Sequence, residues 1–150
     1  MKKINVIMFA VLLFISCGDN SAPTNPLMSD KGIGPITNVK IYDNIDTKMA
    51  SMGEIAFNRN CVSCHKMDKK FIGPSLEQIT ERRSPEWIMN MILNPEVMVK
   101  ENPIAKELLM EYIAPMANQS LSAQEARNIL EYFRQYDETI KNKILKEEVK

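Results

Sequence analysis

The chain has 150 residues, of which 19 are Lys or Arg and 19 are Asp or Glu, so its formal charges cancel. Apolar residues make up 45% of it, and it contains a single His. This composition suits one globular domain with appendages and excludes a collagen-like, disulfide-rich or mostly disordered chain. One imidazole excludes a His-rich zinc site and a multi-haem protein with paired His ligands. Without a basic excess, nucleic acid is not an expected partner.

The N-terminus predicts a secretion signal. Two lysines precede an apolar run of twelve residues, 4–15, which is shorter than the roughly 20 residues of a membrane-spanning helix. Residues 13–17 are Leu-Phe-Ile-Ser-Cys, which resembles the lipobox of bacterial lipoproteins except that Phe stands where Leu is usual. The resemblance implies that residues 1–16 are removed and that Cys17 is lipidated. The alternative is a plain secreted protein.

Residues 17–46 are predicted to form a flexible tether behind the lipid. They are rich in Asn, Ser, Asp, Pro and Gly and show no helical period. Three apolar residues, Ile36, Val39 and Ile41, leave open that part of the segment lies extended on the surface of the domain. Removal of the signal would leave 17 basic against 19 acidic residues, a net charge of −2.

From Thr47 the pattern turns helical, and a first helix is expected up to Cys61. Ser84-Pro85 and Asn102-Pro103 each combine an N-cap residue with Pro at the first helical position, which predicts two further helix starts. A capping box at residues 122–125 predicts the last helix, which residues 138–150 continue or leave frayed. No strand pattern is evident, so an all-α domain is predicted over residues 47–137.

The chemistry of the chain is concentrated in Cys61-Val62-Ser63-Cys64-His65. Two thiols at this spacing can each add to one vinyl group of a haem, and the adjacent His can bind the iron from the proximal side. A structural zinc site would need four protein ligands. A thioredoxin-like dithiol would need a βαβ neighbourhood, and a disulfide would leave His65 unexplained. We therefore expect one covalent haem c on Cys61 and Cys64, with His65 as an axial ligand.

With this motif the chain resembles a class I cytochrome c over about residues 47–136. Gly53 and Phe57 match the first helix of that family, and Tyr132 or Phe133 matches the aromatic residue of its last helix. The resemblance implies four to five helices around a single haem.

Residues 73–76, Gly-Pro-Ser-Leu, match a further segment of the family. There the Pro carbonyl accepts a hydrogen bond from the proximal His. The resemblance therefore implies that Pro74 orients His65 and raises its basicity. The alternative for Gly73-Pro74 is a simple turn.

The second axial ligand must come from another residue type, because no second His exists. Met116 has the best context, since it follows Pro115 in a polar loop just before the capped last helix. Met110, near the end of a predicted helix, and Met98, in a predicted loop, are the alternatives. Other methionines, such as Met89 and Met91, lie within a predicted helix, where they are expected to fill the core.

These features favour a membrane-tethered electron carrier on the periplasmic side of a bacterial cell envelope, expected to be a monomer. Its expected partners are a quinol-oxidising complex as donor and a terminal reductase or oxidase as acceptor. Lys66, Lys69 and Lys70 form either a docking patch or a solvated loop, and Trp87 is expected to pack on the haem or the core. The rival function is a five-coordinate haem peroxidase or gas sensor, which would need a distal group such as Glu101 or Glu111.

Overall fold

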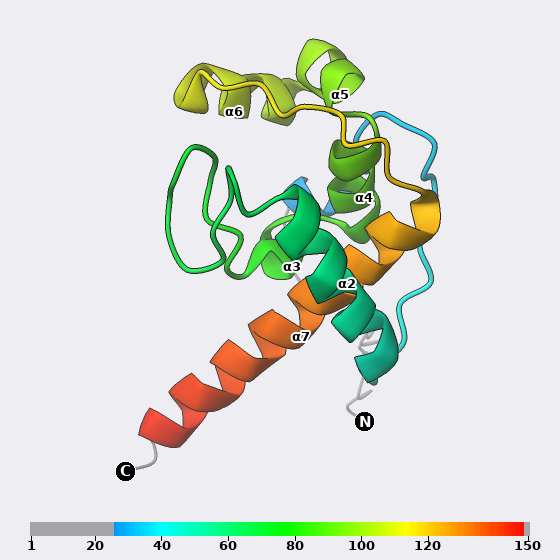
Figure 1. Ribbon diagram of the computed structural model, residues 1–150. Coiled ribbons are helices and arrows are strands. Elements are labelled where there is room, and N and C mark those ends of the chain that lie inside the picture. The colour runs from blue at the N-terminus through cyan, green and yellow to red at the C-terminus, as the bar shows by residue number, and fades with distance from the viewer. Residues whose placement is uncertain (1–25, 149–150) are drawn as a thin grey trace, which may run out of the picture.

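The computed structural model describes residues 26–148, and within them the chain forms helices and loops but no strands (Figure 1). The predicted signal peptide and Cys17 lie outside the described residues. The all-α prediction is confirmed. The helices are α1 (Pro26–Ser29), α2 (Thr47–Asn60), α3 (Ile79–Arg82), α4 (Pro85–Leu93), α5 (Pro95–Glu101), α6 (Pro103–Tyr112) and α7 (Ala123–Glu148).

The helices α2 and α7 cross closely at the centre of the fold (Figure 1). Gly53 of α2 faces the backbone of α7, where any Cβ would collide with the carbonyl group of Asn128. One turn later, the ring of Phe57 lies 5.6 Å from the rings of both Tyr132 and Phe133, measured between centroids. Only a glycine allows the two backbones to approach this closely.

Buried apolar side chains, most of them on α2, α4 and α7, form the main core, and a smaller cluster joins α4 to α5 and α6. The main core comprises Ala56, Phe57, Met67, Ile79, Ile88, Met89, Ile92, Ala126, Ile129, Leu130 and Phe133. The smaller cluster comprises Trp87, Met98 and Ala105. Burying such side chains supplies most of the folding free energy of a domain of this size.

The three predicted helix starts are present with their caps. The hydroxyl of Ser84 accepts from the N–H of Trp87, and the side chain of Asn102 accepts from Ala105. Ser122 and Glu125 satisfy each other's backbone N–H groups, which completes the capping box at the start of α7.

The helices α1, α3 and α5 were not predicted. Met98, which was expected in a loop, lies in α5 and is fully buried. Pro95 does end α4, but its fixed φ and missing N–H also suit the first position of a new helix. The chain therefore turns directly from α4 into α5.

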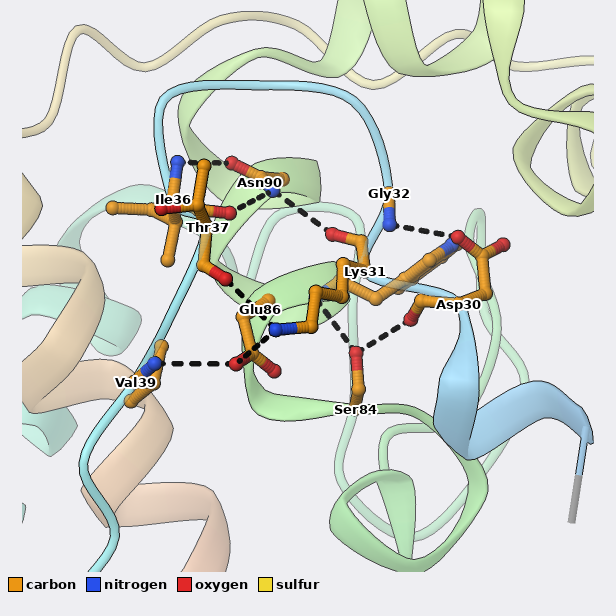
Figure 2. A network of polar contacts seen from close by, with 10 residues as sticks. Asp30, Lys31, Gly32, Ile36, Thr37, Val39, Ser84, Glu86 and Asn90 are labelled. Atoms are coloured by element: carbon orange, nitrogen blue, oxygen red, sulfur yellow. Dashed lines mark hydrogen bonds and ion pairs between the residues drawn. The ribbon is translucent and has the colours of Figure 1, made fainter. Parts of the chain in front are cut away.

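Residues 30–46, called the strap from here on, contain no helix or strand, and the part drawn in Figure 2 arches over α4. The side-chain amide of Asn90 donates to the carbonyls of Lys31 and Ile36, at 2.9 and 2.8 Å, and accepts from the N–H of Ile36 at 2.9 Å. The carboxylate of Glu86 accepts from the N–H of Val39 at 3.2 Å and lies 3.5 Å from the ammonium of Lys31. These two side chains of α4 thus form hydrogen bonds with backbone N–H and carbonyl groups of the strap.

The other end of the strap is fixed to α7 by a buried carboxylate. Glu131 accepts from the N–H of Asp46 at 2.9 Å and from Arg127 and Arg134 at 2.6 and 2.8 Å. Arg134 also donates to the carbonyl of Tyr42. Burial acts to raise the pKa of Glu131, but the hydrogen bonds from Asp46 and the two arginines outweigh it, and the pKa is lowered.

The strap differs from the flexible tether predicted for these residues. Their composition lacks a helical period, but the hydrogen-bond partners that fix them belong to α4 and α7. Of the three apolar residues for which a place on the domain was left open, Ile36 and Val39 pack against the main core, whereas Ile41 is exposed.

Replacing Asn90 by Ala should release the middle of the strap. The change leaves the N–H and the carbonyl of Ile36 without their partner, which costs about 1–3 kcal/mol. Hydrogen exchange should show faster exchange of the Ile36 amide, and urea unfolding should show the lower stability. Asn94→Ala is the matched control, since Asn94 makes one longer bond of 3.3 Å to the strap. Equal effects of the two changes would contradict this role of Asn90.

Candidate functional site

The motif residues are gathered by a tight turn at the end of α2. Cys61 caps the helix, and its N–H donates to the carbonyl of Phe57. The N–H groups of Cys64 and His65 then both donate to the carbonyl of Cys61, at 3.1 and 2.9 Å. This turn places the two cysteines, which form no disulfide, beside the imidazole.

The imidazole of His65 is held in one orientation. Its Nδ1 lies 3.2 Å from the carbonyl oxygen of Pro74, as the resemblance implied. Because a carbonyl can only accept, Nδ1 carries the proton and Nε2 keeps a free lone pair. A Cβ on Gly73 would clash with the imidazole, so the ring lies directly against the backbone there. Burial lowers the pKa of His65, which keeps the ring neutral and ready to bind a metal.

The thiol of Cys61 is half-buried, whereas that of Cys64 is exposed. Burial raises the pKa of the Cys61 thiol to about 11, with a smaller contribution from the nearby Cys64. Both groups lie at the edge of the cavities described next. When a thiol adds to a vinyl group, its sulfur bonds one vinyl carbon and its hydrogen goes to the other, so no oxidant is needed.

Two adjoining cavities, of about 150 and 70 Å³, share Cys61, His65 and Met116 as lining residues. The larger is bounded by the motif and by the loop after α6. The smaller is lined almost entirely by apolar side chains, namely Phe57, Leu76, Ile79, Trp87, Ile88, Met91, Ile92, Ile129 and Phe133. The apolar smaller cavity suits the haem ring, the larger one has polar lining residues, and His65 lines both. The residues present therefore fit a haem. A third, open groove of about 300 Å³ contains none of these three residues and is not part of the site.

Among the candidate methionines, Met116 lies on the loop between α6 and α7 and lines both cavities. The two alternatives lie elsewhere. The sulfur of Met98 accepts the N–H of Ile33 at 3.0 Å, and Met110 is 68% exposed on α6. Neither of them lines either cavity.

Sequence reasoning missed Met91. As expected, it packs against the smaller buried cluster, but it also lines the apolar cavity together with Met116. Helical spacing identifies a buried face and does not distinguish a core from a cavity wall. Trp87 lies in the same wall, as expected, and its indole N–H donates to Asn102 at 3.3 Å.

The lysines after the motif are partly tied to their neighbours. Lys66 donates to the carbonyl of Val62, and Lys70 lies 3.8 Å from the carboxylate of Glu111 and over the ring of Tyr112. Glu111 is exposed, and neither it nor Glu101 lines the two cavities. The structure therefore places neither of these two carboxylates at the cavities, where the peroxidase function would require one.

Comparison with known proteins agrees with this geometry. Residues 50–137 match the family model of cytochrome c. The chain belongs to the cytochrome c family. A solved cytochrome c from Rhodothermus marinus is 42% identical, with a TM-score of 0.71, over 76% of this chain and 97% of that one. Two engineered forms of it, one bound to a carbene intermediate, are also 42% identical, with TM-scores of 0.69 and 0.67. They cover 75% of this chain and 96% of theirs.

The comparison with curated proteins gave no match. As a class I cytochrome c, the protein carries a covalent haem c, and Cys61 and Cys64 are in place to attach it. Cytochrome c proteins are haem electron carriers, and this function holds for the present chain. Within residues 26–148, no helix is long and apolar enough to cross a membrane.

The attachment site can be tested by replacing both thiols. Cys61→Ala combined with Cys64→Ala should abolish haem staining on a denaturing gel, because only a thioether bond survives denaturation. Ser63→Ala, within the same turn, is the control and should keep the stain. Persistent staining in the double variant would contradict the attachment site.

Proposed function

We propose that the protein is a membrane-tethered, monohaem cytochrome c that passes single electrons between redox proteins of a bacterial cell envelope. When bound, the haem supplies an iron that takes up and releases one electron. The chain's own residues bind it, exclude water from it and leave one edge near the surface. The observation that carries the proposal is that His65 and Met116 line the same pair of cavities.

In this proposal His65 and Met116 are the two axial ligands. The lone pair of His65 is fixed by the bond from Nδ1 to Pro74, and Met116 contributes a neutral sulfur from a loop. Two protein ligands leave no coordination position for a substrate, which suits a carrier better than an enzyme. A sulfur ligand and an apolar wall both favour the reduced iron and raise the reduction potential.

The proposed site of electron exchange is the mouth of the larger cavity. Ile72 lines that cavity, and Phe71, Met110 and Ile113 on the adjoining loop and helix end are exposed apolar side chains. Exposed apolar residues of this kind suit a transient protein contact. We propose a quinol-oxidising complex as the donor and a terminal reductase or oxidase as the acceptor, with Lys66, Lys69 and Lys70 at the edge of the contact.

Replacing Met116 tests the ligand and the carrier function together. Met116→Ala should give a high-spin or water-ligated haem, remove the weak far-red band of Met-ligated ferric haem and lower the reduction potential. Met91→Leu, Met98→Leu and Met110→Leu are the volume-matched controls and should keep that band in optical spectra. Loss of the band in one of these controls, with its retention in Met116→Ala, would reassign the ligand.

The second candidate is a five-coordinate haem protein that binds a small ligand. It is favoured by one observation, that an engineered form of the Rhodothermus marinus relative is bound to a carbene intermediate. Wild-type protein that is high-spin and binds carbon monoxide rapidly would support this candidate and overturn the carrier proposal.

The membrane anchor has its own test. Cys17→Ser should move the protein from the membrane pellet to the soluble fraction, because the serine hydroxyl does not replace the thiol that is lipidated. Phe14→Leu, which brings residues 13–17 closer to the usual lipobox, should remain in the pellet. If Cys17→Ser stays in the pellet after an alkaline wash, the anchor lies elsewhere.

A further inference from the structure

The last turns of α7 present apolar side chains that the rest of the domain leaves exposed. The match to the family model ends at residue 137, whereas α7 continues to Glu148 and projects beyond the other helices (Figure 1). In this projecting part, the side chains of Ile144 and Leu145 are 42 and 51% exposed. Neither residue belongs to the buried core clusters.

The exposed pair continues a side of α7 that borders the open groove of about 300 Å³. On α7 this groove is lined by Leu130, Arg134, Asp137, Glu138 and Lys141. Ile144 and Leu145 follow Lys141 by three and four positions, so all three lie on the same side of the helix. Elsewhere the groove is lined by the exposed side chains of Met28, on α1, and Ile41, on the strap. The groove and these five residues are called the groove face from here on.

The charges of the groove face are mixed. The basic residues that line the groove are Arg83, Arg134 and Lys141, and the acidic ones are Asp43, Glu81, Asp137 and Glu138. A long lysine side chain such as that of Lys141 can cover apolar surface with its methylene groups and keep its ammonium in water. Apolar side chains combined with both signs of charge suit a zwitterionic lipid surface, in which a phosphate and an ammonium lie above an apolar layer.

The position of the proposed lipid places a bilayer close to this face. Cys17 precedes Pro26, the first residue of α1, by nine positions, which span at most about 30 Å when fully extended. Met28, two positions further along the chain, already lines the groove. Within residues 26–148 no helix is suited to cross a membrane, so a contact between the domain and the bilayer is a contact at its surface.

We propose that the groove face contacts the surface of the bilayer that holds the Cys17 lipid, with Ile144 and Leu145 inserted among zwitterionic headgroups. The inference rests on the proposed function, in which Cys17 is lipidated. Two half-exposed apolar side chains give a weak contact by themselves. A short covalent link raises the effective concentration of a tethered pair to the order of millimolar, so that a weak contact is populated.

This orientation leaves the haem site free to exchange electrons. The groove and the larger haem cavity have no lining residue in common. The helix α6 and the end of α7 lie at opposite ends of the molecule (Figure 1). The loop after α6, which bounds the larger cavity, therefore remains accessible to a redox protein while the groove face is on the membrane.

The test is hydrogen exchange, measured by mass spectrometry on the lipidated holoprotein in vesicles of phosphatidylethanolamine and phosphatidylcholine. The reference is the Cys17→Ser holoprotein without vesicles. We expect the amides of residues 138–148 to exchange about tenfold more slowly on the vesicles, which corresponds to about 1.4 kcal/mol. The amides of residues 110–119, next to the haem cavity, should exchange at the same rate in both samples.

A pair of double variants identifies the contact. Ile144→Gln combined with Leu145→Gln should lose the slower exchange on vesicles and stay helical, because Gln is a good helix former. Met52→Gln combined with Ile55→Gln is the matched control, since these side chains of α2 are 40 and 67% exposed and do not line the groove. The control should keep the slower exchange of residues 138–148.

Four results would overturn the proposal. They are unchanged exchange of residues 138–148 on vesicles, slower exchange of residues 110–119 instead, equal losses in the two double variants, and an effect that requires phosphatidylglycerol. Exchange of residues 138–148 that slows with rising concentration of the Cys17→Ser protein would show that a second copy covers the face.

Failure of the proposed membrane tether is recognised separately. An intact mass without a lipid on Cys17 would refute the tether and this inference with it. A lipid on Cys17 with unchanged exchange of residues 138–148 would refute the orientation alone. The optical spectrum of the haem tests the carrier function independently of both.

Discussion

The close crossing of α2 and α7 at Gly53 fixes the two parts of the haem site that hold His65, the attachment motif and the loop before α3. It sets the position of Phe57 and, one turn later, of Cys61, so the attachment motif begins at a fixed point on the core. Further along α7, Asp137 holds the start of α3 and with it the loop that contacts His65. One helix therefore aligns the cysteines with the carbonyl that orients the imidazole, although the two are carried by different segments.

The two sides of the site differ in structure: the proximal side is held by many hydrogen bonds, and the opposite side is a loop. The proximal side consists of a helix end, a hydrogen-bonded loop and an imidazole fixed by Pro74. The opposite side is formed by the loop between α6 and α7. This loop, residues 113–122, contains Met116 and has no regular secondary structure. A one-electron carrier benefits from the fixed proximal side, because a site that changes little between its two oxidation states has little to reorganise.

Features that depend on neighbouring residues could be predicted from the sequence, whereas features that depend on distant partners could not. The caps at Ser84, Asn102 and Ser122 and the cysteine motif each lie within a few residues, and all are present as predicted. The strap and the contact of Asp137 with α3 join residues that are 47 to 92 positions apart. Asn90 is an example, because nothing in the sequence around it indicates that its side-chain amide binds the backbone of Lys31 and Ile36.

The strap has a consequence for the order in which the molecule assembles. Its hydrogen-bond partners lie between 47 and 92 residues later in the chain, so each contact closes a long loop and gains nothing until α4 and α7 exist. A chain that is synthesised from its N-terminus makes the strap before these helices. The strap therefore cannot form these hydrogen bonds until α4 and α7 have been made. The segment that is synthesised first depends on helices that are synthesised later.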